Sequence, residues 1–108
     1  MSRTTVEVPL KTNNVDDVLR IITSKLEEKN YKQKIVDGET VWAKGDGVMM
    51  AMRCIGFVFT ETSVIIQGWM KEMLFGEKNL DGFSGRVFKK GMKELIDEMR
   101  TEITVKGL

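Results

Sequence analysis

Histidine is absent from this chain of 108 residues, which also has only one cysteine and one proline. The absence of histidine removes the side chain that most readily exchanges protons near neutral pH, and with it the usual serine–histidine and cysteine–histidine catalysis. Cys54 alone can form neither an internal disulfide nor a cysteine cluster for zinc. We therefore expect no catalytic residues, no metal site and no cofactor, and we do not predict an enzyme.

A strong net charge and a long apolar run are also missing. The chain has 17 basic and 16 acidic residues, so no overall field attracts nucleic acid, which is not an expected partner. The longest apolar stretch, GVMMAMRCIGFVF at residues 47–59, is interrupted by Arg53 and is too short to span a bilayer. The first residues, MSRTTVEVPL, lack the apolar segment of a signal peptide. We expect a soluble, cytoplasmic protein.

The composition is typical of a globular protein, with 42% hydrophobic and 31% charged residues. The length suits a single domain, residues 1–108. Alternating apolar residues at 4–10 predict a strand. Because Pro9 cannot donate a hydrogen bond to a neighbouring strand, this strand should lie at a sheet edge or end early. Asn14 is a good N-cap for the helix that follows, and Asn30 suits its end. Apolar residues recur there at helical spacing, namely Val15, Val18, Leu19, Ile22 and Leu26.

The rest of the chain reads as four strands and a second helix. Asp37-Gly38 predicts a two-residue hairpin turn of type I′, in which both residues need positive φ. Strands are predicted at 48–59 and 64–70, where Gly56 and Gly68 suggest bulges or bends. Residues 71–84 read as a connection. The helix from Gly85 onward has one continuous apolar face, formed by Phe88, Met92, Leu95, Ile96, Met99 and Ile103.

The predicted order is therefore β-α-β-β-β-β-α, an α+β fold with two helices on one face of an antiparallel five-stranded sheet. The same order occurs in TBP-like and helix-grip folds. That analogy concerns the fold alone, since such folds serve DNA binding, lipid binding and structural roles.

Two stretches of the chain resemble a known family more specifically. Their sequences are ETVWAKGDGVMM at 39–50 and QGWMKEMLFGEKNLDGFSGRVFKKGMKEL at 67–95. They resemble an uncharacterised bacterial domain common in Firmicutes, with a VW-x-K-G-x-G hairpin, a W-x-K strand, and GF-x-G followed by KK. In some proteins that domain follows a zinc ribbon, which this chain lacks. The resemblance spans about residues 4–105 and implies the fold. It implies no catalytic residues, because none are established for the family.

The start of the last helix carries a cluster of cations. Arg86, Lys89, Lys90 and Lys93 are spaced i, i+3, i+4 and i+7, so we expect them to share one face opposite the apolar stripe. The helix dipole disfavours cations in these first turns. Together with backbone N–H groups near Ser84, they predict a site for a phosphate or carboxylate, or a contact with a membrane surface. The alternative is a solvated face, whose cost of about 0.3–1 kcal/mol per charge is easily tolerated.

The strands suggest a second surface, because both faces of the strand at 48–59 are apolar apart from Arg53. A two-layer protein should show a polar outer face. Here the predicted outer face carries five residues that would form an interaction surface, namely Trp42, Arg53, Phe57, Ile65 and Trp69. A bulge at Gly56 that changes the register, or a loop that covers the face, is the alternative.

These surfaces predict a small non-catalytic binding or interaction domain. It would use the outer sheet face to form a homodimer or to dock a protein partner, with the basic helix start as a secondary contact. The alternative is a carrier of a small molecule or lipid, with an apolar pocket between the sheet and the C-terminal helix.

Overall fold

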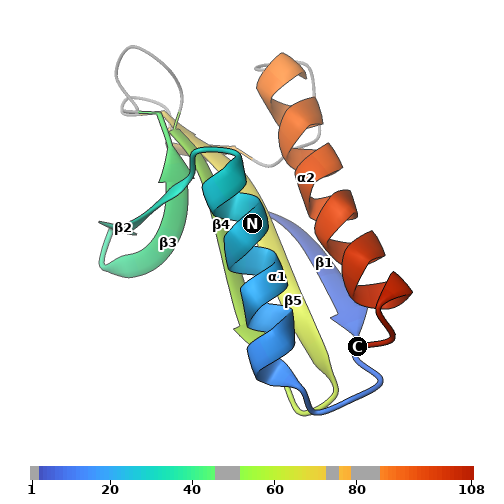
Figure 1. Cartoon of the computed structure of the whole chain (residues 1–108). Coiled ribbons are helices and arrows are strands. Elements are labelled where there is room, and N and C mark those ends of the chain that lie inside the picture. The colour runs from blue at the N-terminus through green and yellow to red at the C-terminus, as the bar shows by residue number, and fades with distance from the viewer. Residues whose placement is uncertain (1–2, 46–51, 73–75, 79–85) are drawn as a thin grey trace.

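The computed structural model describes residues 3–45, 52–72, 76–78 and 86–108 of the chain (Figure 1). The elements along the chain are β1 (Thr4–Pro9), α1 (Val15–Glu28), β2 (Lys32–Val36), β3 (Glu39–Lys44), β4 (Met52–Phe59), β5 (Ser63–Glu72), β6 (Gly76–Lys78) and α2 (Arg86–Val105). The predicted order is confirmed, with one addition. The short strand β6 forms within the segment that was predicted to be a plain connection.

The strands form one antiparallel sheet in the order β1-β5-β4-β3-β2. β6 pairs with β5 at residues 70–72, beyond the segment 63–68 that pairs with β1, so both lie along the same edge of β5. Both helices pack on one side of this sheet and run antiparallel to each other, so that α1 ends where α2 begins (Figure 1). The predicted α+β class is confirmed. We call the two sides of the sheet the helix face and the outer face.

Helix α1 begins where its sequence predicts. The Asn14 side chain accepts a hydrogen bond from the Asp17 N–H at 3.3 Å, which satisfies one of the free donors of the first turn. The chain leaves the helix through Asn30, which has a positive φ of 67°. The buried stripe differs from the predicted one, because Val15 and Leu19 are exposed and Ile21 is buried. The buried residues of α1 are Val18, Ile21, Ile22 and Leu26.

Helix α2 packs the predicted apolar stripe against the helix face from Met92 onward, whereas the side chain of Phe88 lies outside the described part of the chain. The buried side chains are Met92, Leu95, Ile96, Met99 and Ile103. They join Ile22 and Leu26 of α1, and Ile55 and Ile66 of the sheet, in the main hydrophobic core. Burial of side chains of this size contributes about 1.5–3 kcal/mol each, so this core is the principal source of stability.

The β2–β3 hairpin turns as predicted and then leaves the plane of the sheet. Asp37 and Gly38 have φ of 52° and 79°, the two positive values that a type I′ turn requires. Pairing of β3 with β4 covers only residues 42–44 of β3, and Figure 1 shows the hairpin curving away from β4 beyond them. The tip reaches side chains of the outer face, because Asp37 forms an ion pair with Lys71 of β5.

This curl creates a second, smaller core on the outer face. Its fully buried members are Val41, Ala43, Cys54 and Trp69. The Trp69 ring lies against Gly56, where an added Cβ would be 3.5 Å from the ring. The Arg3 guanidinium stacks over the same ring at 3.6 Å from its centroid. An added Cβ at Gly56 would therefore make ordinary van der Waals contact with this ring on the neighbouring strand.

The predicted bulges in β4 and β5 do not form. The register runs without interruption from Met52 opposite Lys71 to Phe59 opposite Val64, with Gly56 opposite Gln67. Continuous pairing keeps the alternation of side chains intact along both strands. This register decides which residues reach each face.

Candidate functional site

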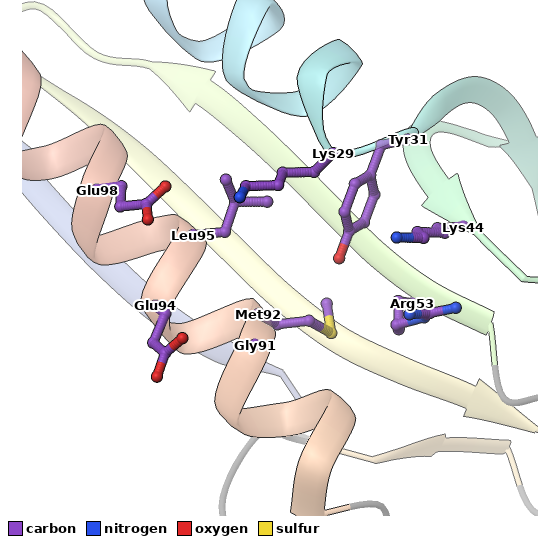
Figure 2. Close-up of a pocket in the computed structure, with 9 residues that line it drawn as sticks. All are labelled: Lys29, Tyr31, Lys44, Arg53, Gly91, Met92, Glu94, Leu95 and Glu98. Atoms are coloured by element: carbon purple, nitrogen blue, oxygen red, sulfur yellow. The ribbon is translucent and has the colours of Figure 1, made fainter.

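A cleft opens between the N-terminal half of α2 and the sheet, with a cavity of about 250 Å³ (Figure 2). It lies where α1 ends and α2 begins, and it faces the part of β3 and β4 nearest to that end. We call it the α2 cleft. Its lining residues are Lys29, Tyr31, Lys44, Arg53, Gly91, Met92, Glu94, Leu95 and Glu98.

Two cations form the sheet side of the α2 cleft. Lys44 of β3 and Arg53 of β4 are directly opposite each other in the antiparallel ladder. Arg53 is also opposite Met70, a buried residue of the main core, so both cations lie on the helix face. Both side chains are half-buried. Partial loss of water strengthens their interaction with any anion, because the local dielectric is lower than in bulk water.

Tyr31 lies beside these cations, between the end of α1 and β2, and is 5% exposed. Figure 2 shows its hydroxyl directed into the space between Met92 and Arg53. Burial raises the pKa of Tyr31 to about 12, against the opposing effect of the Arg53 charge. The hydroxyl is therefore neutral at pH 7 and can donate a hydrogen bond to an anion in the cleft.

The α2 side of the cleft carries acidic and small residues. Glu94 and Glu98 are four residues apart and so lie on the same flank of the helix. Gly91 precedes them, and a Cβ at that position would meet nothing within 4 Å. The absent side chain leaves the cleft wider at this point than any other residue would.

Lys29 completes the cleft at its mouth. Its side chain extends from the end of α1 toward α2 (Figure 2). In the part of the chain that the structure describes, no salt bridge joins Lys29 or Lys44 to Glu94 or Glu98. Opposite charges thus face each other across the cavity without direct contact.

The structure describes only part of the predicted anion site at the start of α2. Ser84 lies outside the described residues, and for Arg86 the structure describes only its place as the first residue of α2. Lys90 and Lys93 are exposed, but Lys89 is only 5% exposed, in phase with Met92 and Ile96. The prediction that the cations share the face opposite the apolar stripe is wrong for Lys89, because the rotation of α2 turns it toward the core side.

The predicted outer surface is also divided between the two faces. Trp42 is opposite Ile55, and Phe57 is opposite Ile66, so both lie with Arg53 on the helix face. Ile65 and Trp69 are the two that lie on the outer face. The expectation that all five share one face is wrong, because the register without a bulge places Arg53 and Phe57 on the same side as the core residue Ile55.

Several residues of the α2 cleft were not identified from the sequence. Arg53 was noted as the one charge within an apolar strand, but Lys29, Tyr31, Lys44, Glu94 and Glu98 gave no separate signal. They come from three segments of the chain, namely the connection between α1 and β2, strand β3 and helix α2. The sequence did not pair Lys44 with Arg53, because the strand predicted at 48–59 placed Arg53 five residues beyond its first residue.

A scan of protein-family models, a search of curated proteins and a search of solved structures each found no match to the chain. The resemblance to an uncharacterised bacterial domain therefore stays a prediction. Among the described residues, no group of three or more histidine, cysteine, aspartate or glutamate side chains could hold a metal ion. No helix in the described ranges is long and apolar enough to cross a membrane.

Proposed function

We propose that this protein is a small non-catalytic binding domain and that the α2 cleft holds a small organic anion. The observation that carries the proposal is the pair Lys44 and Arg53, adjacent on the helix face of the sheet, at the side of a cavity of about 250 Å³. Cations on the core-facing side of a sheet are costly to desolvate, so their placement beside a cavity favours a role for them there.

The chemistry of the lining suits a carboxylate or a phosphate. The planar guanidinium of Arg53 can donate two parallel hydrogen bonds to either group, and Lys44 adds a second positive charge. The neutral Tyr31 hydroxyl adds a donor that carries no charge. Met92 and Leu95 supply the apolar surface that such sites use to hold the remainder of a ligand.

The size of the cleft restricts the ligand. Pockets for drug-sized molecules have volumes of about 300–1,000 Å³. The α2 cleft, at about 250 Å³, lies just below that range. A ligand of the size of a small metabolite fits it, whereas a long acyl chain does not. This changes the carrier hypothesis from an apolar ligand to a small polar one.

Binding is favoured over turnover by the groups that line the cleft. The Tyr31 hydroxyl, with a pKa of about 12, is a poor general base at neutral pH. Cys54 lies in the outer-face core, on the other side of the sheet from the cleft. No described pair of lining residues combines a nucleophile with an activating base.

Calorimetric titration of the purified protein with short-chain carboxylates and inorganic phosphate tests the proposal. Arg53→Gln should weaken binding about 10- to 100-fold, the usual range for loss of a charge-assisted hydrogen bond. Arg20→Gln is the matched control, because Arg20 is an exposed arginine of α1 that does not line the cleft. Equal affinity of Arg53→Gln and the unchanged protein would refute the proposal.

Self-association through the outer face is a second candidate. Val58 is 57% exposed and is directly opposite the half-buried Ile65, which makes a small apolar patch. The support is weaker, because Trp69 is 1% exposed and already covered within the fold. Light scattering of the protein and of Val58→Asp tests it: a dimer that dissociates in the variant would favour this candidate, and a monomer in both would exclude it.

A further inference from the structure

The charges of the α2 cleft differ between its two walls. The sheet contributes the cations Lys44 and Arg53, and α2 contributes the acids Glu94 and Glu98. A third cation, Lys29, extends from the end of α1 toward α2 at the mouth of the cleft. The other flank of α2 is mixed in charge, since Lys93, Asp97 and Arg100 lie there over β1 and Asp97 forms an ion pair with Arg100. The flank that α2 turns toward the cleft carries only acids.

This arrangement places opposite charges across an open space. Lys44 forms no salt bridge with Glu94 or Glu98 in the part of the chain that the structure describes, so these three charges do not neutralise one another by direct contact. A simple anion near Arg53 gains from the sheet wall but is repelled by the carboxylates of α2. A simple amine near Glu94 gains from α2 but is repelled by the cations. A molecule that carries both charges at its two ends gains from both walls.

We infer that the ligand of the α2 cleft is a small amino acid-like zwitterion, with its acidic group at Arg53 and Lys44 and its ammonium group at Glu94 and Glu98. The inference rests on the binding role proposed above and names its ligand class. Met92 and Leu95 lie between the two walls and contact the short hydrocarbon part of the molecule. Gly91 keeps the α2 wall open beside the ammonium position.

A matched set of three probes separates these possibilities. Butyrate, γ-aminobutyrate and butylamine have the same carbon chain and carry the acid alone, both groups, or the amine alone. We expect γ-aminobutyrate to bind the unchanged protein about tenfold more tightly than butyrate, because one additional charge-assisted contact has that order of effect. Butylamine should bind more weakly than γ-aminobutyrate by a similar factor.

The double variant Glu94→Gln with Glu98→Gln tests the α2 wall itself. It should bind γ-aminobutyrate and butyrate with nearly equal affinity, because the ammonium loses its partners while repulsion of the acid is relieved. Asp16→Asn with Glu61→Gln is the control, since it removes two exposed carboxylates from the end of the molecule opposite the cleft. The control should keep the tenfold preference. Circular dichroism of both double variants confirms that the fold is intact.

The outcomes distinguish the two proposals. If butyrate binds as tightly as γ-aminobutyrate to the unchanged protein, or if the preference survives in Glu94→Gln with Glu98→Gln, the zwitterion inference is wrong and the anion-binding role stands. If none of the probes binds, nor any longer amino acid or phosphate, both proposals fail. A preference that disappears only in the Glu94 and Glu98 variant supports the inference.

Discussion

Two arginines on opposite faces of the same sheet show how differently one residue type can be used. Arg3, on the outer face, stacks on the Trp69 ring and donates hydrogen bonds to both carboxylate oxygens of Glu39, at 2.7 and 3.0 Å. Arg53, on the helix face, lies beside a cavity. Both side chains have partners within the fold, but only Arg53 also lines a cavity. The adjoining space, and not the charge alone, is what makes Arg53 the candidate for a ligand.

The largest expected effect concerns the outer face. Trp69→Ala should lower the free energy of unfolding by about 3–5 kcal/mol, because truncation of a fully buried aromatic ring loses its packing and leaves a cavity. Denaturant unfolding measures the change. Affinity for γ-aminobutyrate, measured on the folded fraction, should stay within about twofold, since the ring is on the other side of the sheet. A large loss of affinity would mean that the two faces are coupled.

On the helix face, Tyr31 should make the stability of the protein depend on pH in alkaline solution. Tyr31 has a pKa of about 12 in the fold and about 10 in the unfolded chain. Between these values the unfolded chain loses its proton while the folded protein keeps it, so stability falls as pH rises from about 10 to about 12. Below about 10 both states are protonated and the contribution is fully present.

The chain contains one tyrosine, so phenolate absorbance reports Tyr31 alone. The titration midpoint should be near 12 in the folded protein. Tyr31→Phe should remove this component of the alkaline loss of stability, which is on the order of 2 kcal/mol. A folded-state midpoint near 10 would show that the hydroxyl is open to water.

The two arginines themselves should differ in what their loss removes. Arg3→Met should lower the free energy of unfolding by about 1–2 kcal/mol, through loss of the cation–π contact and the ion pair with Glu39. Arg53→Met should abolish ligand binding, which Arg3→Met should not. Loss of binding in both variants, or in neither, would remove the distinction between them.

The smallest expected effect tests the open wall of the cleft. Gly91→Ala should raise the free energy of unfolding by about 0.5–1 kcal/mol, because alanine is the better helix former and its Cβ meets no neighbour. Gly91→Met should keep much of that gain but occupy the cleft and weaken binding at least about tenfold. Thermal unfolding and calorimetric titration of the same samples measure the two effects. A methionine variant that binds normally would place the ligand elsewhere.

Features that depend on neighbours along the chain were accessible from the sequence. Asn14 caps α1 and Asn30 ends it, and the Asp37-Gly38 turn has the positive φ values that its residues favour. These outcomes follow from local hydrogen bonding and steric preference, which need no tertiary contact. The order of elements and the α+β class followed from the same local patterns.

The faces of the strands were not accessible in this way. Both sides of β4 are apolar, so alternation gave no preference for which side Arg53 would take. Pairing with β5 settled that question and placed Gly56 beneath the Trp69 ring. Lys89 is a similar case, because its burial depends on the rotation of α2 against the sheet.

The two helices and the strands other than β6, with their order and several of their ends, could be read from the sequence, because caps, turns and periodicity act within a few residues. The position of the proposed binding cleft depended on the tertiary structure. The α2 cleft assembles Lys29, Lys44, Arg53 and Glu98 from segments far apart in the chain. Their proximity results from strand register, hairpin curvature and helix rotation, which depend on long-range packing and cannot be read from spacing along the chain.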